Sequence, residues 1–409
     1  MMKNIEQTLI ENFKRYVAVS SQSDGSVTTL PSSEGQRTLA KLLCDELNSM
    51  GYAETELLET GIALARLPGN VDGAKKIGFI AHLDTVDVGL SPDIHPQILR
   101  YEGSLLCLNA QENIMIGEDS HPELAKYRDQ DILFSDGTSV LGADDKSAIS
   151  VMMTLASELK TSRIAHGDIY FAFVPDEEIG LRGAKALPLD KFPVDYCYTI
   201  DCCERGEVIY ETFNAGTAVL DIAGTTAHPM SAKNVLVNPN LIAADFIDLL
   251  RDHGLPEQTE GREGYFWVTD IQGNQNTAKV VVAIRDFVLS QYDDRKAYLQ
   301  SVETLLKHKH PKAEISLSLT DVYSNIAQAM GDDVEALTRL YRVLEVMEIP
   351  AKTIAMRGGT DGSALSVKGL FTPNFFTGAH NFHSRFEFLP IPSFVDSYRV
   401  ALNLIKVDA

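Results

Sequence analysis

Acidic side chains follow three apolar segments of the sequence, at the points where each segment ends. His82 and Asp84 follow residues 77–81, a run of three acids at 176–178 follows residues 168–174, and Asp201 follows residues 194–200. Short continuous apolar runs of this kind predict strands buried on both faces of a parallel sheet. Because ligands bind outside the carboxyl ends of such strands, these side chains can converge although they are distant in sequence.

The negative charge that would gather at this sheet edge indicates what kind of ligand binds there. Two unit charges about 4 Å apart repel each other by about 4 kcal/mol at an effective dielectric constant near ~20. Five carboxylates brought together without a cation would be untenable at neutral pH; they are Asp84, Asp144, Glu177, Glu178 and Asp201. Two divalent cations would offset four of these five charges. The sequence therefore predicts a metal site.

Each of these motifs also has a plainer interpretation when it is taken alone. An H-x-D pair such as His82 and Asp84 is common at protein surfaces. Asp144 and Asp145 precede a helical pattern at 147–160, where acids commonly cap the helix and favour its dipole. In the loop GAHNFHSRFEF, His380 and His383 are equal candidates as ligands by chemistry, and their spacing does not choose between them.

The composition narrows the range of partners. The formal net charge of −21 argues against the basic face that nucleic acids and anionic membranes require. Residues 1–19 predict an amphipathic helix without the features of a signal peptide, and no apolar run approaches the ~20 residues that span a bilayer. The five cysteines form no C-x-x-C pair, which is typical of free thiols in a reducing compartment. We therefore expect a cytoplasmic protein that binds neither nucleic acid nor membrane.

The order of predicted elements indicates an α/β domain interrupted by a smaller α+β domain. Strand and helix patterns alternate up to about residue 211, apart from a long loop rich in Gly, Pro, Asn and Asp that follows the strand at 74–81. From residue 212 the pattern becomes β-α-β-β-α-β, the order of a ferredoxin-like domain. We therefore predict a catalytic α/β domain over 1–211 and 326–409, with an inserted domain over 212–325.

The chemistry-bearing motifs carry a family resemblance. HLDT, GADDK, PDEE, Asp201 and the closing NFH resemble the superfamily of dinuclear zinc aminopeptidases, carboxypeptidases and aminoacylases. Within that superfamily the chain is similar to the peptidase T family of bacterial tripeptide aminopeptidases. That family's pattern matches GADDK, VPDEE, TEGREGY at 259–265, IRDF at 284–287 and RGGTDG at 357–362, in this order, so the likeness covers almost the whole chain.

The resemblance implies a fold, a metal centre and roles for individual residues. The fold would be a zinc-exopeptidase-like three-layer α/β catalytic domain, interrupted by a ferredoxin-like lid or dimerisation domain. Two zinc ions per subunit, or Co²⁺ or Mn²⁺ in their place, would be held by five ligands: His82, Asp144, Glu178, Asp201 and His383. Asp144 would bridge the ions, Glu177 would be the general base and Asp84 would orient His82. His383 is preferred to His380 because the family's ligand lies four positions before the acid at Glu387.

The resemblance also implies a substrate and an assembly. Arg285 and Arg357 would hold the carboxylate end of a short peptide, and His228 would reach the active site of the neighbouring subunit in a homodimer formed through the inserted domain. The predicted activity is hydrolysis of the N-terminal peptide bond of short peptides, above all tripeptides. A dipeptidase or an N-acyl amino acid deacylase of the same superfamily is the alternative. A non-enzymatic metal- or peptide-binding protein is a third hypothesis, against which Glu177 argues, because a binding protein needs no unliganded acid beside the metal.

Overall fold

The computed structural model describes residues 2–331 and 334–407, and these form two compact units. The first unit comprises the described residues up to Tyr210, Ile326–Ile354 and those from Thr360 onward. The second unit comprises Glu211–Asn325 and Ala355–Gly359. The sequence boundaries of the insert, 212 and 325, do not include the short segment 355–359, which begins at the end of strand β15 (Lys352–Met356) and belongs to the second unit.

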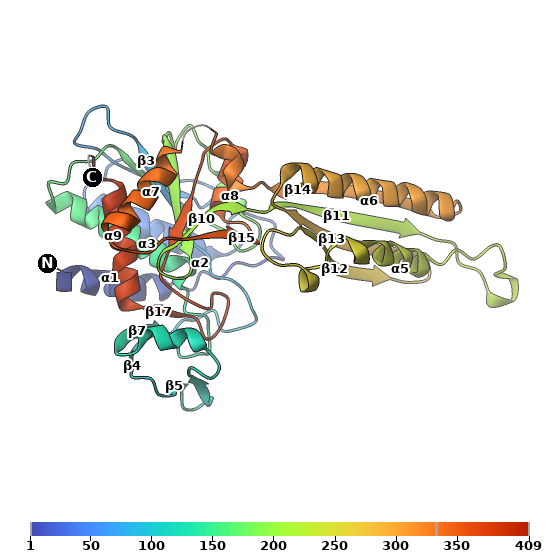
Figure 1. Cartoon of the computed structure of the whole chain (residues 1–409), viewed down its shortest axis with the longest axis horizontal. Coiled ribbons are helices and arrows are strands. Elements are labelled where there is room, and N and C mark those ends of the chain that lie inside the picture. The colour runs from blue at the N-terminus through green and yellow to red at the C-terminus, as the bar shows by residue number, and fades with distance from the viewer. Residues whose placement is uncertain (1, 332–333, 408–409) are drawn as a thin grey trace. The chain divides into compact units, whose positions relative to one another are not determined.

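The first unit is built on an eight-stranded sheet (Figure 1). Its central strands β8 (Ile169–Val174), β3 (Ile77–His82), β9 (Tyr196–Cys202) and β16 (Asn374–Phe376) are parallel. The outer strands are β1 (Thr55–Leu57) and β2 (Ala63–Leu67) on one side, and β10 (Glu207–Thr212) and β15 (Lys352–Met356) on the other. His82 pairs with Val174 in register, so the residues that follow β3 and β8 emerge at the same edge of the sheet.

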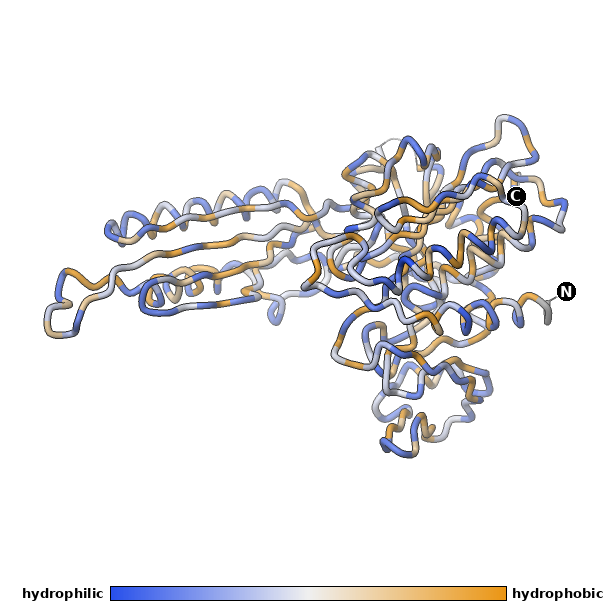
Figure 2. Tube along the Cα trace, turned by 180° about the vertical axis from the view of Figure 1, so that it is seen from behind, coloured by the Kyte–Doolittle hydropathy of each residue, from blue (hydrophilic) through white to orange (hydrophobic). Residues whose placement is uncertain are grey.

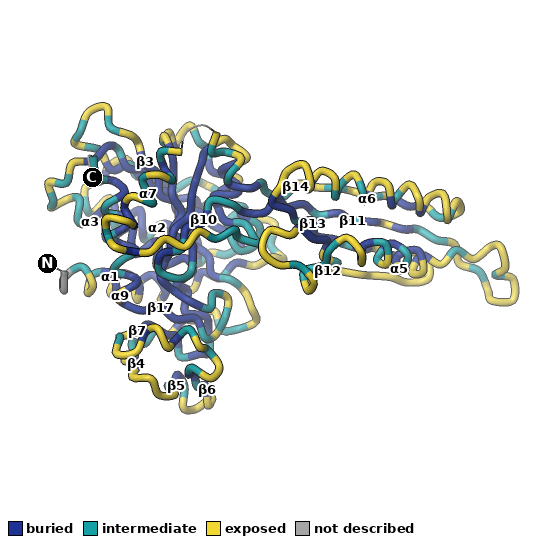
Figure 3. The backbone as a smooth tube through the Cα atoms, viewed as in Figure 1, coloured by how far each residue is buried: buried dark blue, intermediate teal, exposed yellow. Residues whose placement is uncertain are grey.

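Helices cover this sheet on both faces. Helix α3 (Ala143–Thr161) contacts β3 and β9 and is packed against α1 (Met2–Val17) and α9 (Ile391–Leu404). Helix α8 (Asp361–Val367) contacts the same two strands, and α2 (Glu34–Ser49) contacts β1 and β2. The short α4 (Arg182–Ala186) contacts α8, and α7 (Glu335–Val346) contacts α9. Every residue of β3 and β8 is buried, as expected for strands enclosed from both sides (Figure 3).

The segment after β3, expected to be a long loop, contains regular structure, so that expectation was wrong. It forms β4 (Gln97–Tyr101) and β7 (Gln130–Phe134), which pair with each other, and the hairpin of β5 (Leu106–Asn109) and β6 (Ile114–Ile116). Strand β7 also pairs with β17 (Phe388–Pro390) near the C-terminus. A short 3₁₀ helix, η1 (Pro122–Tyr127), completes it. Buried Tyr101, Leu124, Phe134 and Phe388 give this region a small core of its own. Its strands are three to five residues long, too short for their alternation to stand out among the turn residues.

The second unit has the β-α-β-β-α-β order that the sequence predicts. Its antiparallel sheet runs β12 (Tyr265–Gly273), β13 (Thr277–Asp286), β11 (Asn214–Ala223) and β14 (Glu314–Tyr323). Helices α5 (Pro239–Leu250) and α6 (Leu289–Lys309) bury Phe246 and Leu299 against Leu220, Val280 and Val282. Figure 2 shows hydrophilic residues along most of α6, interrupted at intervals by hydrophobic ones, and these include the buried face of the helix.

None of the helices within the described residues is both long enough and apolar enough to cross a bilayer.

Candidate metal centre

His82 and His383 lie on either side of the carboxylate of Asp144. His82 is the last residue of β3, and its Nε2 atom lies 2.8 Å from Oδ1 of Asp144. His383 comes from the loop before β17, and its Nε2 atom lies 3.2 Å from Oδ2 of Asp144. The two oxygens of one buried carboxylate therefore face two histidines that are about three hundred residues apart, 82 and 383, in the sequence.

The ligand atoms form two groups that share Asp144. Atoms of His82, Asp144 and Asp201 lie within 4.8 Å of one another, and so do atoms of Asp144, Glu178 and His383. A third group of the same size joins His82 and Glu178 with Glu177. The structure thus brings together all five side chains named as ligands in the sequence analysis, with Glu177 beside them.

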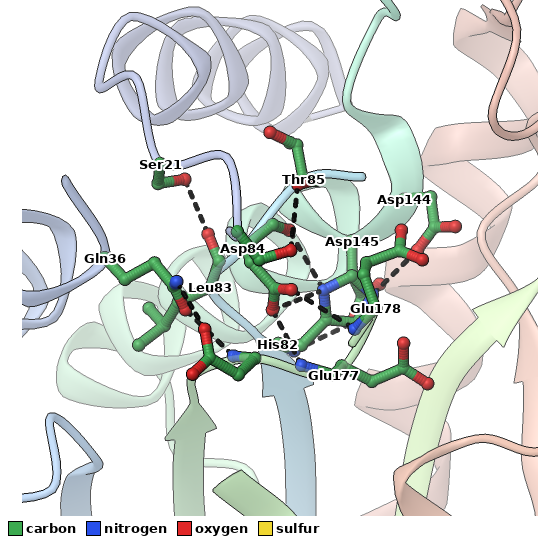
Figure 4. Close-up of polar contacts among 12 residues, drawn as sticks. Ser21, Gln36, His82, Leu83, Asp84, Thr85, Asp144, Asp145, Glu177 and Glu178 are labelled. Carbon is green, nitrogen blue, oxygen red and sulfur yellow. Dashed lines mark hydrogen bonds and ion pairs between the residues drawn. The ribbon is translucent and has the colours of Figure 1, made fainter. Parts of the chain in front are cut away.

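Asp84 lies behind this cluster and faces both the histidine and the acid pair (Figure 4). Its Oδ1 and Oδ2 atoms accept the backbone N–H groups of Glu177 and Glu178, at 2.9 and 3.2 Å. The Nδ1 atom of His82 lies 3.0 Å from the backbone oxygen of Asp84 and 3.5 Å from its Oδ1 atom. Asp84 is therefore placed to orient His82, as a partner of a ligating histidine must be, and it also fixes the turn that carries Glu177.

His380, the histidine that spacing alone could not exclude, occupies a different environment. It is buried, its Nε2 atom lies 2.6 Å from the hydroxyl of Tyr127, and its ring stacks on Phe388 with the centroids 4.8 Å apart. Burial lowers the pKa of His380 to about 4, so the ring is neutral near pH 7. It belongs to none of the metal-ligand groups in the described chain, whereas His383 does.

The electrostatics of the cluster favour added positive charge. Burial and the neighbouring carboxylates raise the pKa of Glu177, Glu178 and Asp201. Contacts with the carboxylates of Asp144 and Glu178 raise the pKa of His383 to about 11. Burial acts to lower the pKa of His82, but the hydrogen bonds of the ring to Asp144 and Asp84 act in the opposite direction. The net result is a raised pKa. Each of these shifts marks a site that binds protons tightly, and a divalent cation can take the place of those protons.

The donor set fits paired divalent metal ions. It consists of imidazole nitrogens and carboxylate oxygens, which suit Zn²⁺ and are also acceptable to Mn²⁺ or Co²⁺. Glu178 Oε1 is buried without a hydrogen bond among the described residues, and it meets His383 Nε2 only as an ion pair at 3.0 Å. A buried oxygen held in this way remains available as a ligand.

Glu387 fixes the loop that carries Asp144. The buried carboxylate of Glu387 accepts the backbone N–H groups of Leu141 and Gly142 through Oε2, at 2.7 and 2.8 Å, and that of Asp144 through Oε1, at 3.1 Å. It thereby ties the loop of Asp144 to the chain segment that supplies His383. From the sequence alone, Glu387 served only as a reference position for His383. Its one signal was an acid between two phenylalanines, Phe386 and Phe388, where an unpaired charge would be costly.

The three residues predicted to bind substrate lie in the second unit, and they fall into two places. Arg285 pairs in register with Tyr265 and Ala215, and its guanidinium lies 5.7 Å from the ring centre of Tyr323. Arg357 lies over Tyr265, 5.2 Å from the ring centre, so the two arginines share one end of the sheet. His228 lies beyond the other end of β11, in the exposed loop between β11 and α5 (Figure 1).

Arg357 already has structural partners within that unit. It donates through Nη1 to the backbone oxygens of Gly261 and Glu263, at 3.2 and 3.0 Å, and through Nη2 to Oγ1 of Thr259, at 2.7 Å. These three acceptors belong to the segment 259–265 that contributed to the family resemblance. Arg357 therefore shapes this loop, whatever else it binds.

Comparisons with known proteins bear on the identity of the chain. Residues 63–261 match the family described as Peptidase family M28, and residues 210–314 match the Peptidase dimerisation domain. A peptidase T-like protein of Yersinia pestis is 56% identical over 98% of this chain and 97% of its own length. A peptidase T of Geobacillus thermodenitrificans is 38% identical over 98% of both chains. The chain belongs to the peptidase T family.

Solved structures show that this family member has a known fold. An aminopeptidase, PepT, from Bacillus cereus matches it with a TM-score of 0.77 and 23% identity, over 98% of both chains. A tripeptidase from Staphylococcus aureus matches with a TM-score of 0.77 and 21% identity, again over 98% of both chains. The mixed α/β architecture with an inserted dimerisation domain is therefore confirmed, and this peptidase T family member is a peptidase.

Glu387→Gln provides a test of the support for Asp144. The amide would turn an N–H group toward at least one of the three backbone donors, so the 141–144 loop should shift and affinity for divalent metal should fall by ~10–100-fold. The measurement is a zinc titration against a competing chromophoric chelator. Glu112→Gln, the same exchange at an exposed loop position, is the matched control and should bind as wild type does. Unchanged zinc affinity in Glu387→Gln would show that the loop needs no such support.

Proposed function

We propose that this peptidase T family member is a metal-dependent aminopeptidase that removes the N-terminal residue of tripeptides. One observation carries the proposal: Asp144 belongs to two groups of metal-ligating atoms, and Glu177 lies beside them. The similarity to an aminopeptidase and a tripeptidase over nearly the full chain supports the choice of substrate. The five cysteines are free thiols, which supports a reducing, cytoplasmic location.

In this proposal the five ligands hold two zinc ions. His82 and Asp201 would complete one site, Glu178 and His383 would complete the other, and Asp144 would contribute to both. When bound, such a metal pair activates a water and polarises the peptide carbonyl. Asp84 holds the ring of His82 from behind, and Glu387 holds the backbone of Asp144, so the ligands are oriented before metal binds.

Glu177 acts as general base and then as general acid. Its carboxylate lies next to the ligand atoms of His82 and Glu178, and its backbone is fixed by Asp84. Burial raises the pKa of Glu177, which makes the carboxylate a stronger base than an exposed one. It takes a proton from the attacking water and delivers that proton to the leaving amine, so that both steps use one side chain.

Arg285 and Arg357 bind the carboxylate of the peptide, because an arginine fork pairs bidentately with a carboxylate. His228 donates a hydrogen bond to the oxyanion that forms at the scissile carbonyl. Strand β11 separates the two ends of the second unit: from Ala215, opposite Arg285, to Ala223 the chain rises about 27 Å at ~3.4 Å per residue. An extended tripeptide is only about 10 Å long. One copy of the second unit therefore cannot offer both groups to one substrate.

This separation supports the proposal that the protein acts as a homodimer. The match of residues 210–314 to a peptidase dimerisation domain points to the second unit as the contact. In a two-fold symmetric dimer each insert faces its twin through the same surface. His228 of one subunit then serves the peptide held by the arginines and metals of the other.

The assignment of the metal ligands predicts a graded loss of zinc. Asp144→Ala removes an oxygen from both sites, so metal content should fall from about two equivalents to near zero, whereas His383→Ala should retain about one. The measurement is elemental analysis after dialysis against dilute zinc. His380→Gln, the control at the other histidine of the loop, should keep both ions. Two full equivalents in Asp144→Ala would refute its bridging role.

The base assignment is tested by Glu177→Gln, which keeps the shape of the side chain but removes the proton acceptor. With zinc content unchanged, kcat for tripeptides should fall by ~10²–10⁴. Release of the N-terminal residue is followed on a panel of dipeptides, tripeptides, tetrapeptides and N-acetyl amino acids. Wild type should prefer tripeptides; a preference for dipeptides or N-acetyl amino acids would favour a dipeptidase or a deacylase instead. Near-wild-type turnover by Glu177→Gln would assign the base elsewhere.

Shared active sites can be tested by mixing two inactive proteins. His228→Ala lacks the donor, whose removal should cost ~10²–10³ in kcat, and Glu177→Gln lacks the base. After subunit exchange at equal amounts about half of the dimers are mixed, and each mixed dimer has one site with both groups, which should restore about a quarter of wild-type activity. Exchange itself is monitored by native mass spectrometry. If exchange occurs without recovery, His228 does not act across the dimer.

A further inference from the structure

The turn that carries the acid pair is held by three successive backbone hydrogen bonds to side chains. The N–H groups of Glu177 and Glu178 donate to the two carboxylate oxygens of Asp84. The N–H group of Asp176 donates to Oε1 of Gln36, at 2.9 Å. Asp176 adopts a left-handed backbone conformation, with φ of +57°, that a non-glycine residue rarely takes without support. The conformation of the turn thus depends on Asp84 on one side and on Gln36 on the other.

Asp176 itself is a buried carboxylate that belongs to none of the metal-ligand groups in the described chain. Both of its oxygens accept the backbone N–H of Ser32, at 2.9 and 3.2 Å, and Oδ1 also accepts the hydroxyl of Ser32. Arg182 lies 3.2 Å from Oδ2 as an ion-pair partner. Of the three acids in the run 176–178, the first therefore anchors the turn, while the other two face the metal ligands.

Gln36 contacts Asp176 through both ends of its amide. Its Nε2 atom donates to Oδ1 of Asp176, at 2.7 Å, while its Oε1 atom accepts the N–H of the same residue. Gln36 is fully buried in the first turns of α2 (Figure 4). The same Nε2 atom lies 3.2 and 3.1 Å from the hydroxyls of Ser32 and Ser33. The neutral amide of Gln36 thus donates to the carboxylate of Asp176 and accepts from the backbone N–H group of the same residue.

The segment before α2 is itself attached to the end of β3. The hydroxyl of Ser21 donates to the backbone oxygen of Leu83, at 2.7 Å, and the N–H of Ser23 donates to that of Thr85, at 3.1 Å. A side chain at Gly35 would meet the backbone oxygen of Ser20, because a Cβ atom there would lie only 1.8 Å from it. Gln36 therefore follows a close-packed segment that is hydrogen-bonded to Leu83 and Thr85, the residues on either side of Asp84.

We propose that Gln36 is a positioning residue for Glu177, because it holds Asp176 by main chain and side chain and so fixes the turn that presents the base. This inference rests on the proposed role of Glu177 as general base. Gln36 touches neither the ligand atoms nor Glu177; it acts through Asp176, one residue away from the base. A displacement of about 1 Å at a reacting group can cost ~10²-fold in rate. The hydrogen bonds between Gln36 and Asp176 can therefore affect turnover through the position of Glu177.

Gln36→Glu is the sharpest single test, since it changes one NH₂ group to an oxygen. The new carboxylate keeps an acceptor for the N–H of Asp176 but opposes the carboxylate of Asp176, so the turn should move. We expect kcat for a tripeptide to fall by ~10–100-fold, with KM within about twofold and two equivalents of zinc retained. A crystal structure of the zinc-loaded variant should show the Glu177 carboxylate displaced by about 1 Å, the scale on which reaction geometry matters.

The double variant Gln36→Glu/Asp176→Asn reverses the direction of the hydrogen bond between side chains 36 and 176 instead of removing it. The asparagine amide can donate to the glutamate, while its remaining oxygen still accepts from Ser32 and Arg182. We expect this pair to restore kcat to within about threefold of wild type and to return Glu177 to its place, since paired exchanges of this kind cancel. Gln111→Glu, the same exchange at an exposed position in the first unit, is the matched control and should behave as wild type.

Three results would overturn the proposal. The first is Gln36→Glu with wild-type kcat and an unmoved turn, and the second is a loss of kcat with Glu177 in its original position. The third is a double variant no more active than Gln36→Glu. If Gln36→Glu does not fold, Gln36→Met removes both bonds without adding charge, and the same loss of kcat and displacement of Glu177 are expected for it. The crystallographic comparison does not depend on turnover, so it decides the positioning role even if wild-type protein hydrolyses none of the peptides.

Discussion

Buried carboxylates can gather at one edge of a sheet only if each has hydrogen-bond donors or a cation to hold it. The first unit meets this constraint in two ways. Asp144, Glu178 and Asp201 face the ligand cluster and the histidines. Asp84, Asp176 and Glu387 belong to none of the ligand groups in the described chain, and each accepts backbone N–H groups. The loops that build the site are the ones that supply these N–H groups, so the need to hold buried negative charge also determines the shape of the site.

Much of the first unit could be predicted from the sequence because its central strands are enclosed on both faces. Continuous apolar runs such as 168–174 have few alternatives in a protein of this length, and the acids that end them mark the ligand-binding edge. The region between β3 and α3 could not be predicted in the same way. Its small sheet of β4 and β7 takes its third strand, β17, from more than two hundred residues later, and local sequence carries no trace of such a pairing.

The site shows the same division between local and long-range information. His82 and the acid pair follow directly from strand ends, but the choice between His380 and His383 came from the family resemblance. The physical difference is Tyr127, which lies beside His380 in the folded chain, 253 positions away in the sequence. Gln36 and Glu387 were missed for the same reason. A glutamine in a helix and an acid in a loop look ordinary until the backbone N–H groups that they accept are known.

Backbone amides are well suited to this supporting role because they donate hydrogen bonds without adding a mobile charge. A lysine or arginine behind the ligands would lower the affinity of the cluster for cations, since it would neutralise the charge that attracts them. The N–H groups of Leu141, Gly142 and Asp144 instead satisfy Glu387 and leave the negative charge of the site intact. The arginine at Asp176 fits the same logic, because that carboxylate is not among the grouped ligand atoms of the described chain and its charge is not needed for metal binding. In the first unit, backbone N–H groups thus satisfy the buried carboxylates of Glu387 and Asp84 without adding positive charge beside the ligand cluster.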